Sequence, residues 1–86
     1  MPKIQFSEKA WEDYLYWQAQ DKKTLKRINM LLKEISRGGK PKIGKAELLK
    51  GDLSGLASVR IDDANRLVYR LHGDIIQVEQ CRSHYN

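Results

Sequence analysis

The first half of the chain carries hydrophobic residues at helical spacing. Lys3–Phe6 alternates briefly and predicts a short strand, after which Ser7 is a predicted N-cap for a helix. Asp21 interrupts that helix and is predicted to cap a second one. The predicted buried stripe of the second helix consists of Leu25, Ile28, Leu31, Leu32 and Ile35. Gly38 and Gly39 are predicted to end it, because glycine accepts the left-handed backbone conformation common at helix C-termini.

The second half changes to the alternation of hydrophobic and polar residues that is typical of strands. Strands are predicted at Leu56–Ile61, Arg66–His72 and Ile75–Arg82, with a loop over Lys40–Lys50 before them. Gly73-Asp74 is a hairpin signal, and short turns between consecutive strands indicate an antiparallel sheet. We therefore expect one α+β domain over residues 1–86, in the order β-α-α-β-β-β, with two N-terminal helices packed on a twisted antiparallel sheet.

The clearest predicted strand has two distinct faces. Leu67, Tyr69 and Leu71 share one face, and we expect them to point toward the helices. Arg66 and Arg70 then lie on the opposite face, where a domain this small can present charged groups without burying them.

Positive charge is concentrated in the middle of the chain. The formal net charge is +5, and residues 22–45 hold nine basic residues against one acid, Glu34. The nine are Lys22, Lys23, Lys26, Arg27, Lys33, Arg37, Lys40, Lys42 and Lys45. A clustered positive field attracts polyanions and favours contact with nucleic acid, although a solvated helix face followed by a basic loop would give the same pattern.

Other bulk properties exclude whole classes of protein. No apolar run is long enough for a membrane span or a secretory signal, so we expect no membrane association and a cytoplasmic location. Cys81 is the only cysteine, which rules out an intramolecular disulfide and disfavours a cysteine-built metal site. No phosphate-cradling glycine loop, histidine pair at metal spacing or Gly-x-Ser-x-Gly elbow is present, and we expect neither a cofactor nor a metal.

The polar residues that remain suit cleavage of RNA. They are Glu47, Lys50, Arg60, Arg66, Arg70, His72, His84 and Tyr85. RNA supplies its own nucleophile, the 2′-hydroxyl, so a carboxylate or imidazole that removes its proton and a second group that protonates the departing 5′-oxygen are sufficient. Arginine side chains would hold the phosphate oxygens as negative charge builds on them.

Each of these residues also has a simpler interpretation. Glu47 in a loop can be a solvated carboxylate, and His84 and Tyr85 can be residues of a frayed terminus. Arg60 and Arg66 can form surface ion pairs with Asp62 or Asp63, which contribute little stability.

Five stretches, in order, carry a resemblance to a known family. They are residues 11–17 (WEDYLYW), 44–50 (GKAELLK), 53–61 (LSG followed by SVRI), 66–69 (RLVY) and 81–85 (CRSHY). Together they resemble the YoeB/Txe branch of the RelE superfamily of bacterial messenger-RNA endonucleases, over nearly the whole chain. The resemblance implies the RelE-like, microbial-RNase-like α+β fold predicted above.

The resemblance also implies a role for each matched residue. Glu47 stands where the family has its general base, and His84 where it has its general acid. Arg66 matches the arginine that stabilises the transition state, and Tyr85 the terminal tyrosine that orients the substrate. The remaining matches, implied to position phosphate, are Lys50 and Arg60. The residues implied to dock on ribosomal RNA are Lys22, Lys23, Lys26, Arg27 and Lys33.

The partners implied by the resemblance are messenger RNA in the ribosomal A site, a cognate antitoxin of the YefM/Axe type and a second copy of the chain. Operator DNA would be bound only through the antitoxin complex. The expected function is therefore the toxin of a type II toxin–antitoxin system that cuts messenger RNA. Two alternatives stay open: a non-enzymatic ParE-like toxin on the same scaffold, and a basic RNA- or ribosome-binding domain without turnover.

Overall fold

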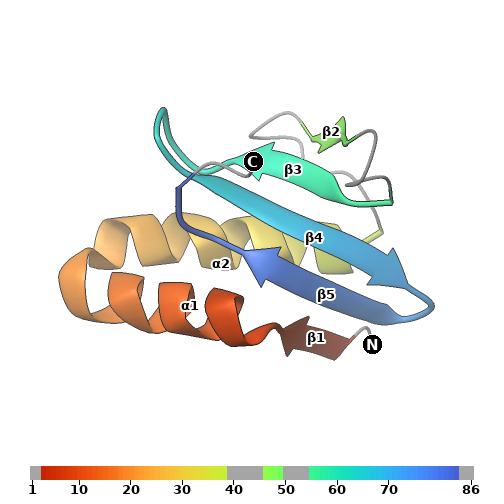
Figure 1. Ribbon diagram of the computed structural model, residues 1–86, viewed down its shortest axis with the longest axis horizontal. Helices are drawn as coiled ribbons and strands as arrows, with labels where there is room; N and C mark the ends of the chain where they lie inside the picture. Colours follow the sequence, from red (N-terminus) through yellow and green to blue (C-terminus); the bar gives the residue numbers. More distant parts are fainter. Residues whose placement is uncertain (1–2, 39–45, 50–54, 84–86) are drawn as a thin grey trace.

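Two helices cover one face of a five-stranded sheet in the computed structural model of the chain (Figure 1). The structure describes residues 3–38, 46–49 and 55–83. Its elements are β1 (Lys3–Phe6), α1 (Glu8–Gln20), α2 (Lys22–Ser36), β2 (Glu47–Leu48), β3 (Ala57–Arg60), β4 (Arg66–His72) and β5 (Ile75–Gln80). The predicted α+β class with two N-terminal helices is confirmed.

The helices begin at the predicted caps. The Ser7 hydroxyl accepts a hydrogen bond from the Ala10 amide at 3.0 Å and donates to the Glu79 carbonyl of β5 at 2.7 Å, which ties the start of α1 to the sheet. The Asp21 carboxylate accepts hydrogen bonds from the Thr24 hydroxyl and from the amides of Lys23 and Thr24. These bonds, led by that of the Thr24 hydroxyl, hold the pKa of Asp21 below its usual value. Each cap satisfies amides that a helix start leaves without partners.

The sheet is mixed rather than antiparallel throughout. Its strand order is β1-β5-β4-β3-β2, and β1 pairs in parallel with β5, with Lys3 opposite Ile75 and Phe6 opposite Val78. The three other pairings are antiparallel, and for β3–β4 and β4–β5, whose strands are joined by short turns, this is the direction that the sequence predicts. Strand β2, which follows the helical pair in the chain, runs antiparallel to β1, and the three successive antiparallel pairings β2–β3, β3–β4 and β4–β5 bring β5 into the direction of β1.

Strand β2 falls within the segment Lys40–Lys50, which the sequence predicts as a loop. Glu47 and Leu48 pair in antiparallel fashion with Ser58 and Ala57 of β3, so the prediction of a loop is wrong at these two positions. Two residues are too short for alternation to mark a strand, and the pairing with β3 makes it one. Strand β5 also ends at Gln80 rather than at Arg82.

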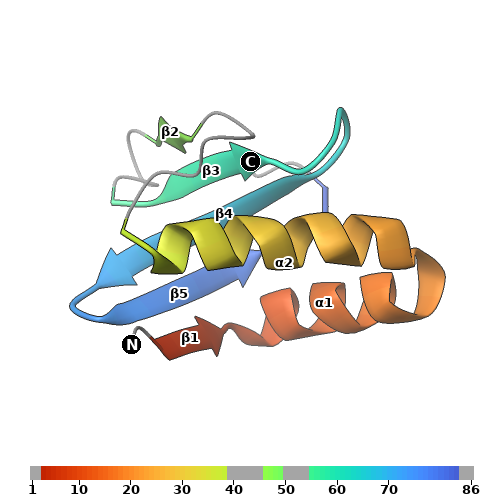
Figure 2. The ribbon, with the colours of Figure 1, turned by 180° about the vertical axis from the view of Figure 1, so that it is seen from behind.

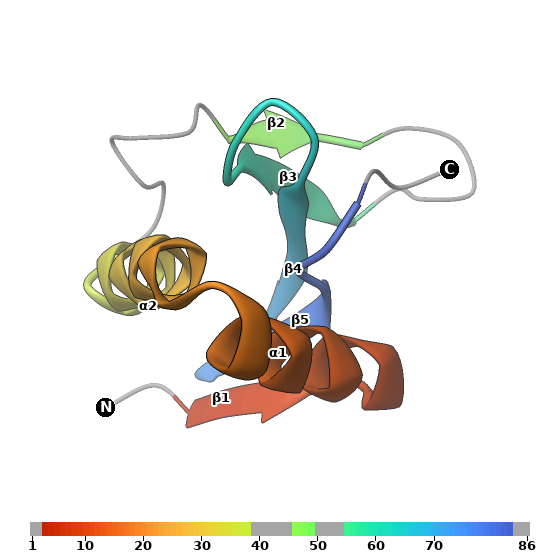
Figure 3. The same cartoon turned by 90° about the vertical axis from the view of Figure 1, so that its left-hand side faces the viewer.

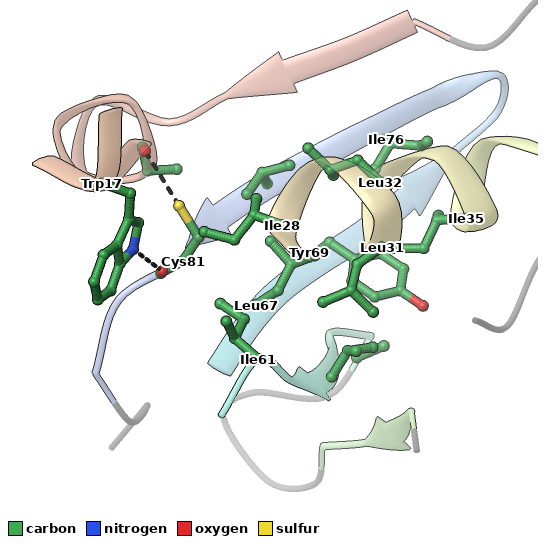
Figure 4. Close-up of a cluster of buried hydrophobic side chains, with 14 residues drawn as sticks. Trp17, Ile28, Leu31, Leu32, Ile35, Ile61, Leu67, Tyr69, Ile76 and Cys81 are labelled. Atoms are coloured by element: carbon green, nitrogen blue, oxygen red, sulfur yellow. Dashed lines mark hydrogen bonds between the residues drawn. The ribbon is translucent and has the colours of Figure 1, made fainter. Parts of the chain in front are cut away.

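The helix-facing side of the sheet holds the main core. Figure 4 shows side chains of α2, including Ile28, Leu31 and Leu32, packed against Leu67 and Tyr69 of β4. The predicted α2 stripe and the predicted orientation of Leu67 and Tyr69 are therefore confirmed. Leu71 departs from the prediction: it lies near the β4–β5 turn and is 54% exposed.

The opposite side of the sheet is partly covered. Figures 1 and 2 view the molecule from opposite sides, with the sheet in front in one and the helices in front in the other. Val68 points away from the helices and packs with Leu49 and Leu56 in a second, small apolar cluster. This cluster lies next to Ser58, which is paired with Val68 across β3 and β4. The face that carries polar side chains thus has an apolar patch of its own.

Candidate functional site

Arg66 is the centre of a polar cluster on the sheet face opposite the helices. Its Nε donates a hydrogen bond to Oγ of Ser58 at 2.6 Å, and its Nη2 lies 3.4 Å from Oε1 of Glu47. The Arg66 side chain is only 16% exposed, whereas that of Glu47 is 61% exposed. Three adjacent strands therefore bring a half-buried guanidinium and an accessible carboxylate into contact.

The sheet register explains why these residues meet. Glu47 lies opposite Ser58, and Arg60 lies opposite Arg66. Side chains of directly opposed residues share a face of the sheet, so all four lie on the same side. Residues 19 positions apart in the chain meet because β2 and β4 flank β3.

Arg60 forms the ion pair that its simpler interpretation predicts. Its Nη2 lies 2.8 Å from Oδ1 of Asp63, and both side chains are largely exposed. Arg66 does not follow that interpretation, since its partners are Glu47 and Ser58 rather than the acids of the β3–β4 turn. The two neighbouring arginines thus differ: one is fixed in the sheet and the other is paired at the surface.

The chain after β5 returns to this cluster. The Arg66 amide donates to the Ser83 carbonyl at 3.1 Å, and the Ser83 amide donates to Oδ1 of Asn65 at 2.7 Å. His84 and Tyr85, predicted from the sequence to be catalytic, lie outside the described residues, as does Lys50. Ser83 immediately precedes His84, so the last described residue of the tail is in contact with the arginine of the cluster.

The tail is also held from the helical side. Oδ2 of the buried Asp13 accepts a hydrogen bond from the Cys81 amide at 3.1 Å. Figure 4 shows the second bond, in which Nε1 of Trp17 donates to the Cys81 carbonyl at 2.8 Å. The Arg82 guanidinium lies 3.6 Å from the centre of the Tyr16 ring. Burial, followed by the nearby Asp13 carboxylate, raises the pKa of the Cys81 thiol to about 12, so it stays protonated and is not a nucleophile.

A largely apolar hollow of about 360 Å³ lies beside Glu47. Its lining consists of Ala46, Glu47, Leu48, Gly55, Ala57, Tyr69 and Leu71. Burial raises the pKa of the Tyr69 hydroxyl, which keeps that group neutral. Arg70 and His72, the other sequence candidates of β4, are exposed and lie toward its far end.

The lysines of α2 belong to the helical layer, which packs on the face of the sheet opposite the Arg66 cluster (Figure 3). The exposed ones among the five predicted contacts are Lys22, Lys23, Lys26 and Lys33. Arg27 is half-buried, and its guanidinium donates to the carbonyls of Ile61 at 2.9 Å and Arg60 at 3.3 Å. Arg27 therefore ties α2 to the end of β3, a role that the sequence pattern does not reveal.

The arrangement suits acid–base chemistry on a phosphodiester. An exposed carboxylate can accept a proton, and a guanidinium fixed beside it can hold negative charge on phosphate oxygens. No group of three potential metal-ligating side chains occurs among the residues the structure describes, and no helix in those ranges is long and apolar enough to cross a membrane.

Sequence reasoning missed three residues that shape the cluster. Ser58 is fully buried and contacts Arg66, Asn65 contacts the tail, and Asp13 is a buried carboxylate. Ser58 could have been found, since it stands on the Arg66 face of a strand whose neighbours Ala57 and Val59 face the core. The contacts of Asn65 and Asp13 span 18 and 68 positions and have no local signal.

Comparison with known proteins gives consistent similarities. Residues 6–85 match the family described as YoeB-like toxin of bacterial type II toxin–antitoxin system. Toxin YoeB of Streptomyces coelicolor is 48% identical over 83 residues, covering 96% of this chain and 99% of the relative. Two solved structures from Staphylococcus aureus have TM-scores of 0.90. One is a YoeB–YefM complex, 45% identical over 99% of both chains, and the other is a YoeB dimer, 47% identical over 98% of both.

Proposed function

The chain belongs to the YoeB-like toxins of bacterial type II toxin–antitoxin systems, and from this premise we propose that it is an endoribonuclease that cuts messenger RNA on the ribosome. The proposal is supported most by one observation: Glu47, Arg66 and the residue before His84 lie in one connected cluster. The expected site is therefore built from residues that are far apart in sequence.

The proposed reaction needs only groups of the chain and of the RNA. Glu47 removes the proton of a 2′-hydroxyl, whose oxygen attacks the adjacent phosphorus. Arg66 holds the phosphate oxygens as their negative charge increases, and His84 protonates the departing 5′-oxygen. The products are a 2′,3′-cyclic phosphate and a free 5′-hydroxyl, so no water is consumed. General acid–base catalysis of this kind contributes about 10²–10⁴-fold to the rate.

The contacts of Arg66 support its proposed role. Its Nε is engaged by Ser58 and its amide by the Ser83 carbonyl, while Nη2 lies 3.4 Å from the exposed Glu47 carboxylate. A guanidinium fixed at one edge needs little reorganisation when phosphate arrives at the other edge. Charge stabilisation by such a preorganised donor is worth about 10²–10³-fold in rate.

Three further residues are proposed to act on the substrate. Arg60, beside Arg66 across β3 and β4, would bind phosphate after releasing Asp63, which is an exposed and weakly held partner. Lys50 would bind phosphate, and Tyr85 would orient the substrate at the end of the chain.

The lysines of α2 are proposed to dock on ribosomal RNA. Lys22, Lys23 and Lys26 of α2 line an exposed shallow hollow, whereas the Arg66 cluster lies on the sheet face opposite the helices. Charge reversal of these three residues should weaken ribosome binding and reduce its salt dependence. Slow cleavage of a free RNA oligonucleotide, if present, should be unchanged.

A YefM-type antitoxin and a second copy of the chain are the proposed protein partners. The similar Staphylococcus aureus proteins were solved as a YoeB–YefM complex and as a YoeB dimer. Operator DNA would be bound through the antitoxin complex, and the toxin would act in the cytoplasm, where messenger RNA is translated.

Cell-free translation of one message tests the enzymatic proposal. Wild-type protein should stop translation and leave 2′,3′-cyclic phosphate ends at ribosome-protected sites. Glu47→Gln, Arg66→Ala and His84→Ala should each slow cleavage by at least about 10²-fold while unfolding at a temperature close to that of wild type. Glu12→Gln, which neutralises an exposed carboxylate on α1, is the matched control. Intact message with wild-type protein, or breaks in DNA instead of RNA, would contradict the proposal.

A further inference from the structure

Ser83 has a backbone conformation that requires support. Its φ is 65°, in the left-handed region that residues other than glycine seldom adopt. Both of its peptide groups are held by consecutive residues of the β3–β4 turn and β4: its amide donates to Oδ1 of Asn65 and its carbonyl accepts from the Arg66 amide. The two contacts fix the residue that immediately precedes His84.

Asn65 is itself oriented by the turn. Its Nδ2 donates to Oδ1 of Asp62 at 3.0 Å and its amide donates to the same oxygen at 2.8 Å. Its carbonyl accepts from the amides of Ile61 and Asp62. Because the amide nitrogen of the side chain is engaged by a carboxylate, the side-chain oxygen is the atom that faces Ser83.

The tail is fixed on its other side as well. The Cys81 peptide is held between Asp13 and Trp17 of α1, two residues before Ser83. Chain ends usually fray unless they are tied down. Here the ties extend to the last described residue, Ser83, which has no regular strand pairing to hold it.

We propose that Asn65 is a positioning residue for the general acid His84. Arg66 follows Asn65 and His84 follows Ser83, so the contacts of Ser83 with the Asn65 side chain and the Arg66 amide set the direction in which the chain enters His84 relative to the guanidinium. The inference rests on the proposed ribonuclease function. It adds a residue that touches neither substrate nor reacting atoms and acts through the backbone of the tail.

Single-turnover cleavage on ribosomes tests this role. Asn65→Ala should lower the cleavage rate by about 10–100-fold, since a displacement of about 1 Å in a reacting group has an effect of this size. The double variant Asn65→Ala/His84→Ala should be no slower than His84→Ala alone, because a residue that acts through another has no effect once that residue is gone. Additive losses would overturn the proposal.

A message with sulfur in place of the 5′-bridging oxygen at the cleavage site gives a readout that loss of stability would not produce. A thiolate leaves without protonation, so this substrate should restore both Asn65→Ala and His84→Ala to near the wild-type rate, while Glu47→Gln stays slow. If the sulfur substrate rescues His84→Ala but not Asn65→Ala, Asn65 does not act through the acid.

The exchange of Asn65 and Asp62 supplies a rescue variant. Asp62→Asn/Asn65→Asp keeps the net charge, keeps a donor–acceptor pair in the turn and keeps an oxygen acceptor for the Ser83 amide. It should restore cleavage of the normal message and slow hydrogen exchange of the Ser83 amide, which Asn65→Ala should accelerate. If Asn65→Ala accelerates hydrogen exchange of the Ser83 amide but leaves the cleavage rate undiminished, the proposal is overturned. A wild-type protein that leaves the message intact would instead count against the ribonuclease function itself.

Discussion

The Ser58 hydroxyl and the Arg66 Nε form a 2.6 Å hydrogen bond between β3 and β4. Ser58 is fully buried, and its neighbours in β3, Ala57 and Val59, belong to the core on the other face of the sheet. The hydroxyl thus gives the guanidinium a fixed anchor inside the sheet. The contact between Arg66 Nη2 and the Glu47 carboxylate, at 3.4 Å, is 0.8 Å longer than the bond to Ser58. The Glu47 side chain is also much more exposed than that of Arg66.

Removal of this anchor should both slow cleavage and lower the stability of the fold. Among the residues that the structure describes, Ser58→Ala leaves the Arg66 guanidinium with its contact to Glu47, and we expect cleavage about tenfold slower with little change in KM. The free energy of unfolding should fall by about 1.5–3 kcal/mol, the usual contribution of a hydrogen bond that involves a charged group. Ser36→Ala, which removes an exposed hydroxyl at the end of α2, is the control for loss of a serine. Equal rates for the two variants would contradict this view of Ser58.

Lysine should not substitute for Arg66 in cleavage, so Arg66→Lys should be a poor enzyme. An ammonium group cannot donate at the Nε position to Ser58 while also facing Glu47 with a second nitrogen. We therefore expect a loss of cleavage within about tenfold of that in Arg66→Ala, measured in single turnover. The melting temperatures of the two variants serve as the control for folding. A lysine variant with near wild-type activity would show that charge alone is sufficient.

Arg60 and Asp63 can be separated by their single variants. If Arg60 binds phosphate, Arg60→Ala should raise KM for ribosome-bound message by about 3–10-fold, whereas Asp63→Ala should leave it equal or lower because the arginine is released. Stability should change little in both, since exposed ion pairs contribute about 0–1 kcal/mol. Parallel effects of the two substitutions on KM would indicate that the ion pair, and not the free arginine, is what matters.

Asp13 should stabilise the fold mainly through the hydrogen bond that it accepts from the Cys81 amide. Asp13→Ala leaves the buried Cys81 amide without its acceptor and should cost about 1–3 kcal/mol. In a domain of this size each kcal/mol lowers the melting temperature by about 4–8 °C. Asp13→Asn retains an acceptor oxygen and should lose less than half as much. Similar melting temperatures for the two variants would mean that the charge, paired with Lys9, is the stabilising feature.

The Cys81 thiol should make the fold sensitive to alkaline pH. Its pKa in the folded protein is raised to about 12 from 9.0, so above pH 9 the unfolded chain binds fewer protons than the folded one. The free energy of unfolding should then fall as pH rises from 9 toward 12, by at most about 1.4 kcal/mol per pH unit. Urea unfolding at pH 8, 9 and 10 measures this slope, and Cys81→Ala should reduce it. Rapid labelling of the native thiol at pH 8 would contradict the burial on which the prediction depends.

The helices and their caps could be predicted because their determinants are local. Ser7 and Asp21 act on amides within three residues, and the α2 stripe depends only on spacing along one helix. The alternation of residues along β4 predicted its two faces, and it correctly placed Leu67 on the core face and Arg66 on the other face. Local patterns thus predicted where the elements lie and which side of each is buried.

The sequence alone determined the class of the fold, the orientation of α2 and β4, and the set of residues with suitable chemistry, because each depends on residue type and short-range period. Only the tertiary structure decided that β1 joins β5 in parallel and that Glu47 lies in a strand. It also decided that Ser58 contacts Arg66 and that Asn65 contacts Ser83. Those pairings join residues far apart in the chain, and their register is set by the packing of the whole sheet against the helices.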